Sequence, residues 1–194
     1  MSVNMSKGQR ISLEKRGGGE LTRVRMGLGW DAIPKKGLFG RVKQKAIDLD
    51  ASCVVLDGSR SEIDAVWFRK LKSSDGSITH TGDNLTGEGE GDDESIIVEL
   101  DRVPRNAQTL VFTVTSYSSQ GFSEVQNAFC RLVDETNGSE VARFDLSATG
   151  PHTAMILATV YRDSSGGGWK MAAIGDTGKG KTYKDMTQMI QNVA

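Results

Sequence analysis

One segment of the chain constrains its fold more than any other, because its charge and its glycine content both oppose regular structure. Between Ser73 and Asp101 lie nine of the chain's 25 acidic side chains and none of its 24 Lys and Arg residues. Glycine recurs within it at positions 82, 87, 89 and 91, and glycine is unfavourable in the interior of both helices and strands. The segment is therefore predicted to be a tightly bending loop that presents carboxylates on both sides.

Carboxylates gathered this closely repel one another unless a cation lies among them. Ca²⁺ takes about 6–8 oxygen ligands from carboxylates, amide carbonyls and backbone carbonyls, so it suits such a loop. The alternative is a solvated acidic turn, which is what most charge runs are. The amide oxygen of Asn84 among the acids, and the strand-like run Ile96–Val98 directly after them, favour the metal site. The loop is not an EF-hand, because Leu85, Gly87 and Glu88 break that spacing.

Composition and length indicate one ordinary globular domain. With 194 residues, 37% hydrophobic and 25% charged, residues 1–194 are predicted to form a single domain in the soluble class. No apolar run approaches the roughly 18 residues of a membrane span, and the N-terminus lacks the apolar core of a signal peptide. We therefore expect a cytoplasmic protein without membrane insertion.

The few residues suited to redox or zinc chemistry are placed unfavourably for it. Cys53 and Cys130 each stand within an apolar run and are expected to be buried, reduced thiols, with a disulfide between them as the alternative. His80 and His152 are too few for a typical zinc site with two cysteines so far apart in the chain. No nucleophile–base pair is apparent, so catalysis is not expected.

Alternating apolar and polar residues with turn signals between them predict many short strands. An Asn137-Gly138 turn between two such runs is a strong hairpin signal. The expected strands are 9–13, 21–28, 48–57, 65–68, 96–100, 109–117, 128–133, 140–144, 153–161 and 169–174. Only the last stretch looks helical, where apolar residues recur at three- and four-residue spacing from Tyr183 to Val193.

The predicted fold class is therefore all-β in the main: an antiparallel β-sandwich with a short C-terminal helix and a long acidic metal-binding loop. A second segment, Pro34 to Lys45, is basic and contains glycine, and it is predicted to be a flexible surface loop. Its positive charge serves solubility or, alternatively, an anionic partner.

One string imitates a nucleotide-binding motif. The residues from Gly175 to Thr182 fit G-x-x-x-x-G-K-[ST], after a predicted strand and before a predicted helix. Only twelve residues follow Thr182, so no later strand can supply the parallel neighbour or the Mg²⁺-holding acid of a P-loop fold. A flexible basic turn is the favoured interpretation.

Three stretches carry a resemblance to a known family. Gly27-Leu28-Gly29-Trp30-Asp31, Asp48-Leu49-Asp50-Ala51-Ser52 and above all the string from Gly82 to Glu94 resemble the TerD family of tellurium-resistance and bacterial stress proteins. The resemblance extends over essentially the whole chain. Trp67–Leu71, Asn127–Arg131 and His152-Thr153 are most similar to its TerZ branch.

The resemblance implies a calcium-binding β-sandwich in a cytoplasmic bacterial stress protein. If the strand ends and the acidic loop meet, they offer more oxygen ligands than one ion needs, so two Ca²⁺ ions are expected, and Mg²⁺ should compete poorly. The metal-ligand candidates are Asp31, Asp48, Asp50, Asp83, Asn84, Glu88, Glu90, Asp92, Asp93 and Glu94.

Two classes of function remain open at this point. The first is a Ca²⁺-ordered interaction module whose partners are other tellurium-resistance proteins, with membrane association left open and no nucleic acid expected. The second is a metal-dependent site for a nucleotide or phosphate ligand that uses the basic loop Gly175–Thr182. The first is preferred, because the chain lacks an evident catalytic pair.

Overall fold

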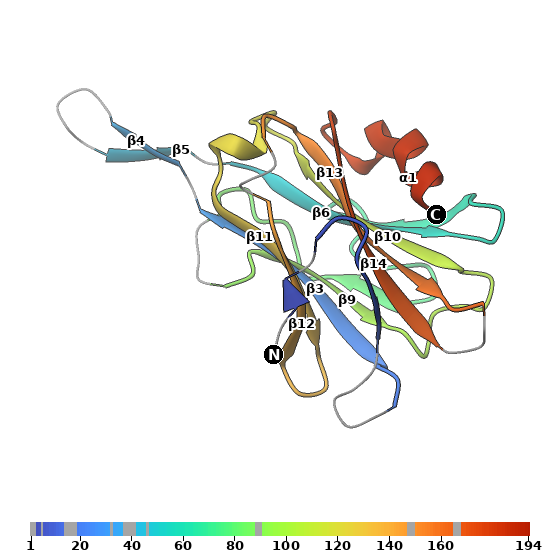
Figure 1. The fold of residues 1–194 in the computed structure, drawn as a ribbon. Coiled ribbons are helices and arrows are strands. Elements are labelled where there is room, and N and C mark those ends of the chain that lie inside the picture. The colour runs from blue at the N-terminus through green and yellow to red at the C-terminus, as the bar shows by residue number, and fades with distance from the viewer. Residues whose placement is uncertain are drawn as a thin grey trace.

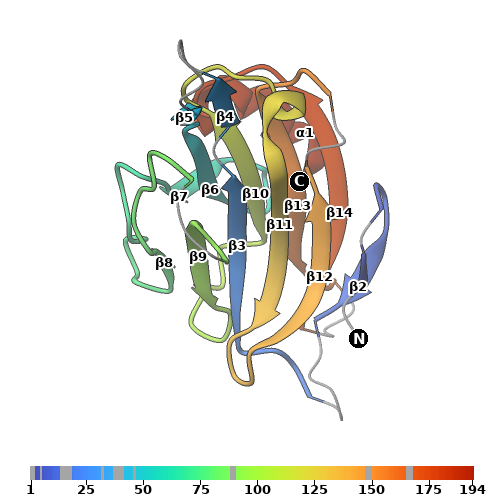
Figure 2. The same cartoon turned by 90° about the vertical axis from the view of Figure 1, so that its left-hand side faces the viewer.

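The computed structural model describes residues 3–4, 6–13, 19–31, 33–36, 42–45, 47–87, 91–146, 150–164 and 168–194. Two β-sheets face one another across an apolar core, and the C-terminal helix covers one outer face (Figures 1 and 2). This architecture confirms the predicted all-β sandwich with a short C-terminal helix.

The strand bounds are as follows: β1 (Val3–Asn4), β2 (Arg10–Ser12), β3 (Arg23–Asp31), β4 (Ile33–Lys36), β5 (Val42–Lys45), β6 (Leu49–Leu56), β7 (Glu62–Val66), β8 (Ile78–His80), β9 (Glu94–Glu99), β10 (Thr109–Ser116), β11 (Gln126–Asp134), β12 (Ser139–Asp145), β13 (Ala154–Arg162) and β14 (Trp169–Gly178). Two 3-10 turns, Phe122–Glu124 and Tyr183–Met186, and the helix α1 (Thr187–Val193) complete the described elements.

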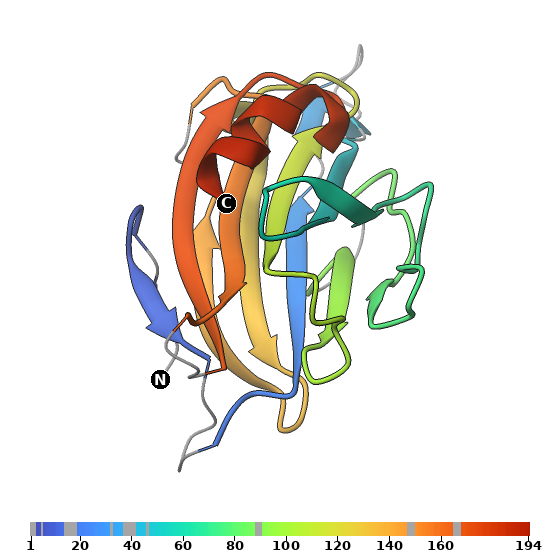
Figure 3. The same ribbon diagram turned by 90° about the vertical axis from the view of Figure 1, so that its right-hand side faces the viewer.

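Sheet A has the strand order β1-β12-β11-β3-β9-β8, and sheet B has the order β2-β14-β13-β10-β6-β7. Within the part of the chain that the structure describes, neighbouring strands pair antiparallel, except that β1 runs parallel to β12. The short strands β7 and β8 are the edge strands of the two sheets on the same side of the sandwich (Figure 3). The acidic segment connects β8 to β9 at this side.

Alternation along the central strands explains the core. In β10, Leu110, Phe112 and Val114 enter the core between the sheets, whereas Val111 belongs to a second apolar cluster on the outer face of sheet B. The predicted apolar stripe of the C-terminal segment packs on this outer cluster through Tyr183, Met186 and Ile190. Figure 3 shows α1 lying against that face.

The segment predicted as a flexible basic loop from Pro34 to Lys45 is different in the structure. It contains the antiparallel pair β4–β5, with Ile33 opposite Lys45 and Lys36 opposite Val42. Figure 1 shows this pair extending away from the sandwich. Backbone pairing needs no apolar periodicity, so the loop prediction, made from charge and glycine alone, was wrong for residues 34–36 and 42–45.

The two cysteines lie in different sheets and are free thiols. Cys53 is in β6 and Cys130 is in β11, and both are buried. Burial raises the pKa of both thiols, which leaves little reactive thiolate.

Among the described residues, no helix is long and apolar enough to span a membrane.

Truncation of a central core side chain tests the packing. Phe112 is 1% exposed in the middle of sheet B, so Phe112→Ala should lower the free energy of unfolding by about 3–5 kcal/mol. The measurement is urea denaturation followed by circular dichroism. Gln188→Ala on the exposed face of α1 is the control and should change stability by less than about 0.5 kcal/mol. Equal effects for the two variants would contradict the assigned core.

Candidate metal centre

The candidate site lies where the acidic segment passes the beginning of β6. Asp48 and Asp50 stand at that end of β6, and the neighbouring strand β10 holds them in place: the Tyr117 amide donates to the Asp48 carbonyl oxygen at 3.0 Å. The Asp48 amide in turn donates to the hydroxyl oxygen of Ser118 at 3.2 Å. Two acids that are two residues apart are thereby fixed at one rim of sheet B.

The acidic segment brings a third carboxylate to this rim. Asp48, Asp50 and Asp83 each offer an oxygen atom, and these atoms lie within 4.8 Å of one another. Asp50 is 2% exposed, and its Oδ2 has no hydrogen-bond partner among the described residues; the same holds for Oδ1 of Asp48. A buried carboxylate oxygen without a donor is costly.

The electrostatics of Asp48 and Asp50 show the same conflict. Burial, reinforced by the charges of Asp48, Glu94 and Asp83, raises the pKa of Asp50 to about 8. Burial, with the charges of Asp83 and Glu94, raises the pKa of Asp48 to about 6. The site therefore favours either protons or a bound cation, and its oxygen-only ligands fit a hard divalent ion.

Glu94 joins the acidic segment to both sheets. Its side chain is fully buried at the start of β9 in sheet A, and its Oε2 accepts a hydrogen bond from the Ala51 amide of sheet B at 2.8 Å. Its Oε1 accepts from the Asn84 amide of the loop at 3.1 Å. Glu94 thus lies beside the three-acid cluster and sets the position of the loop relative to β6.

His80 lies against Glu94, a contact that sequence reasoning missed. Its Nδ1 accepts from the Gly82 amide at 3.1 Å, so the proton of the neutral ring is assigned to Nε2. Nε2 lies 3.4 Å from Oε2 of Glu94. The alternation of β8 was the available signal, because it places His80 on the same face as buried Ile78.

Asn84 shapes the loop through its side chain. Its Oδ1 accepts from the backbone amides of Thr86 at 3.0 Å and Gly87 at 3.1 Å. Its Nδ2 donates to Oδ1 of Asp93 at 3.0 Å. The amide oxygen expected to be a metal ligand is therefore engaged in the turn of the loop itself.

Asp93 and Asp31 form a second acidic group close to the first. Oδ2 of Asp93 accepts from the Trp30 amide at 2.9 Å, and Oδ2 of Asp31 accepts from Nδ2 of Asn127 at 2.5 Å. Burial raises the pKa of Asp93, with further contributions from Asp31 and Glu94, against the opposing Trp30 hydrogen bond. Asp31 is at the end of β3 and exposed, so this group opens to solvent.

Asp92 points away from the other acids. Its carboxylate is nearly buried and forms ion pairs with Arg25 of β3 and, at 2.7 Å, with Arg131 of β11. The structure thus brings Asp92 together with two arginines and separates it from the three-acid cluster. Glu88 and Glu90, the remaining predicted ligands, lie outside the described residues.

Three glycines allow the acidic segment to approach the sandwich so closely. A Cβ at Gly27 would lie 2.2 Å from the Asp92 carboxylate, and one at Gly29 would lie 2.5 Å from the carbonyl oxygen of Gly91. Gly87, with φ +66°, would place its Cβ 2.2 Å from the Trp30 indole nitrogen. The glycines of the Gly27–Asp31 string therefore serve backbone approach, and Trp30 itself is held by a bond to the Ile47 carbonyl at 2.9 Å.

The nucleotide-like string has a structure that leaves little room for phosphate. Its first half belongs to β14, which ends at Gly178. The amides of Lys181 and Thr182 donate to Oδ2 of Asp185 at 2.8 and 3.0 Å, and the Gly180 amide donates to the Thr153 hydroxyl oxygen at 3.1 Å. Asp185 thus accepts amides that a phosphate-binding loop would leave free, and these bonds lower its pKa.

Comparison with known proteins identifies the family of the chain. The TerD domain model matches residues 1–189. The chain is 46% identical over 186 residues to tellurium resistance protein TerZ of Serratia marcescens, covering 95% of this chain and 94% of that protein. It is 41% identical to stress response protein SCP2 of Bacillus subtilis (strain 168), covering 91% and 92% of the two chains.

A solved structure agrees at the level of the fold. The crystal structure of a homologue of telluride resistance protein (TerD) from Streptomyces coelicolor A3(2) superposes with a TM-score of 0.73 at 23% identity, covering 88% of this chain and 98% of that one. The fold and the site thus define a class of protein: a β-sandwich with an acidic loop that glycines allow to pack closely against it. The chain belongs to the TerD family.

Substitution of Gly29 tests the close approach of the loop. Gly29→Ala should lower the free energy of unfolding by about 1–3 kcal/mol, because the methyl group collides with backbone that cannot move away without breaking the Asp93–Trp30 bond. Gly58→Ala is the matched control: its nearest neighbour is 3.7 Å away, so stability should change by less than about 0.5 kcal/mol. If Gly29→Ala leaves the unfolding free energy unchanged in denaturation curves recorded with a chelator, the loop is not held against β3.

The raised pKa values of Asp48 and Asp50 predict that the metal-free protein becomes less stable as the pH rises. Between the ordinary aspartate pKa and about 8, the folded state binds more protons at Asp48 and Asp50 than the unfolded state does. Their contribution to stability is complete below about pH 4 and is lost as the pH rises through about 6 and 8. Urea midpoints in chelator should therefore fall from about pH 5 to pH 9, and less steeply in Asp50→Asn. Parallel profiles for the two proteins would contradict this assignment.

Proposed function

We propose that this chain is a calcium-binding stress-response protein of the tellurium-resistance type. Its relatives include proteins named for tellurium resistance in Serratia marcescens and for stress response in Bacillus subtilis. The proposed activity is binding rather than catalysis: Ca²⁺ orders the acidic loop, and the ordered surface binds partner proteins in the cytoplasm. The two free, buried thiols fit a reducing compartment.

The observation that supports calcium most strongly is the pair of buried carboxylate oxygens without donors. Oδ2 of Asp50 and Oδ1 of Asp48 are orphaned beside a third acid, Asp83. By contrast, both carboxylate oxygens of the neighbouring Glu94 accept backbone amides, from Ala51 and Asn84. A cation bound among the three acids removes both the desolvation cost and the mutual repulsion.

The ligand chemistry favours Ca²⁺ over other ions. The three clustered side chains that the structure describes, Asp48, Asp50 and Asp83, offer only oxygen ligands, which disfavours zinc and copper. Mg²⁺ requires a tight octahedron and keeps its waters, whereas Ca²⁺ accepts irregular sets of carboxylates and waters. The proposed first ion binds Asp48, Asp50 and Asp83. The proposed second ion binds Asp31 and Asp93, with Glu88 and Glu90 as further candidates.

The proposed link from metal to function is the surface around the site. Leu85 in the acidic loop is 59% exposed, and Tyr117, whose amide bonds Asp48, is 41% exposed. Large apolar side chains exposed beside a metal site are candidates for partner contact. Metal binding would hold the loop, and with it Leu85, in one position. Other tellurium-resistance proteins are the proposed partners, including assemblies at a membrane.

Calorimetric titration of chelator-stripped protein with Ca²⁺ tests the proposal. We expect about two ions per chain, with affinity tighter than about 10 µM, and no displacement by equimolar Mg²⁺. The double variant Asp48→Asn, Asp83→Asn keeps the shape of the cluster but removes charge, and should weaken binding about tenfold or more. Asp101→Asn, an exposed acid outside the cluster, is the control and should bind as the unmodified chain does.

Absence of binding heat, together with an unchanged melting temperature in Ca²⁺, would contradict the proposal and leave the segment as a solvated acidic turn. Equal loss of binding in the Asp101 control would show that only the general negative charge of the region matters.

A further inference from the structure

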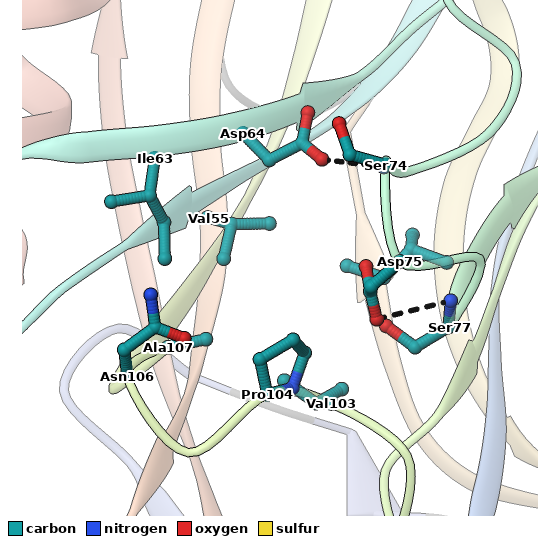
Figure 4. Close-up of a pocket in the computed structure, with 11 residues that line it drawn as sticks. Val55, Ile63, Asp64, Ser74, Asp75, Ser77, Val103, Pro104, Asn106 and Ala107 are labelled. Carbon is teal, nitrogen blue, oxygen red and sulfur yellow. Dashed lines mark hydrogen bonds between the residues drawn. The ribbon is translucent and has the colours of Figure 1, made fainter.

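A second concave site lies on the same side of the sandwich, toward the opposite end of β6 from the metal centre. It is a cavity of about 150 Å³ between β7, the turn that precedes β8, and the loop that precedes β10 (Figure 4). Val55 of β6 lines this cavity, whereas Asp50 of the same strand belongs to the metal cluster. The two sites are therefore separate places on one strand.

One side of the cavity is mainly apolar, with Asn106 as its polar member. Figure 4 shows Val55 and Ile63 on one wall and Pro104 with Val103 on the facing wall, and Ala107 lies between them. Val55 and Ala107 are buried, while Ile63 remains 41% exposed at the rim. An exposed isoleucine at the edge of an apolar cavity leaves hydrophobic surface that a bound alkyl group would cover.

The other side carries carboxylates and a buried hydroxyl. Asp64 and Asp75 face the cavity from one side in Figure 4. Ser77 is 2% exposed, and its Oγ has no hydrogen-bond partner among the described residues. The Ser77 amide donates to Oδ2 of Asp75 at 3.3 Å, so the hydroxyl lies beside that carboxylate. A buried hydroxyl without a partner is costly, and a ligand N–H would satisfy it.

The two carboxylates differ in charge balance. Asp64 forms an ion pair with Lys70 and accepts the amides of Ala65 and Ser74, both at 2.7 Å, which together lower its pKa against the effect of burial. Asp75 has no ion-pair partner in the described part of the chain. Arg102, whose pKa the charge of Asp75 helps to raise, is itself paired with Glu99. Asp75 is therefore a carboxylate at the cavity that no ion pair in the described part of the chain neutralises.

We propose that this cavity binds a primary alkylammonium group. The ammonium would donate to Asp75 and to the orphaned Ser77 hydroxyl, and a chain of about four or five carbons would lie along Val55, Ile63 and Pro104. The size agrees, since a cavity of about 150 Å³ holds a ligand as large as benzene. Free aliphatic amines and the lysine side chain of a peptide share this chemistry. The inference does not depend on calcium binding.

Amide chemical-shift titration of Ca²⁺-loaded protein tests the proposal with n-butylammonium as the probe. Shifts should concentrate at the amides of residues 74–78, 103 and 105–107, with a dissociation constant of roughly millimolar, as expected for so small a ligand. 1-Butanol at the same concentrations should bind at least about fivefold more weakly, because it lacks the charge. Asp75→Asn retains the acceptor for the Ser77 amide and should weaken butylammonium binding about fivefold or more.

Asp101→Asn, a neighbouring exposed acid that does not line the cavity, is the matched control and should leave the titration unchanged. Three outcomes would overturn the proposal. They are shifts confined to residues 48, 50 and 83, binding of butanol as tight as that of butylammonium, and butylammonium binding to Asp75→Asn as tight as to the unmodified chain. Cadaverine and Nα-acetyl-lysine N-methylamide separate the two sources: tighter binding of the former assigns a free amine, and tighter binding of the latter assigns a peptide lysine.

Discussion

The arrangement of the acidic side of this molecule depends on one buried carboxylate. Glu94 belongs to sheet A, accepts an amide of sheet B through Ala51, and accepts an amide of the acidic loop through Asn84. Two β-sheets and the acidic loop thus share one carboxylate that is fully removed from water. A buried charge is tolerated only where donors surround it. The same group adds negative potential to Asp48 and Asp50, so the contact that positions the loop also increases the attraction of its neighbours for a cation.

Strand alternation and turn signals in the sequence were enough to predict the sandwich, the terminal helix and the strand that begins at Asp48 and Asp50, whereas the strand predicted to end at Leu28 continues to Asp31. They could not separate the acids of the loop by role. Asp92 is adjacent to Asp93, yet it faces Arg25 and Arg131, because neighbouring strands of sheet A place those arginines below it. That pairing depends on the register between β3 and β11, in which Arg131 stands opposite Gly27. Charge and spacing within one loop contain no information about that register.

The backbone conformation of the loop could not be predicted from the sequence either. Asn84 was predicted to offer its amide oxygen to a metal, whereas it closes a turn with Thr86 and Gly87. Asn side chains that bond their own backbone two or three residues later are common in turns, so the local alternative was available on physical grounds. The lysine-containing pair β4–β5 could not be predicted either, because edge pairing of polar strands leaves no apolar periodicity to detect.

The position of Trp30 has a consequence for the fluorescence of the protein. Its indole is buried, bonds the carbonyl of Ile47 immediately before Asp48, and lies directly against Gly87 of the acidic loop, while its backbone amide bonds Asp93. Of the other two tryptophans, Trp169 bonds Leu100 and Trp67 packs with Phe68 and Tyr183 in the cluster under the C-terminal helix. The fluorescence emission of Trp30 therefore depends on the position of the acidic loop, so the protein carries an intrinsic fluorophore beside its cluster of carboxylates.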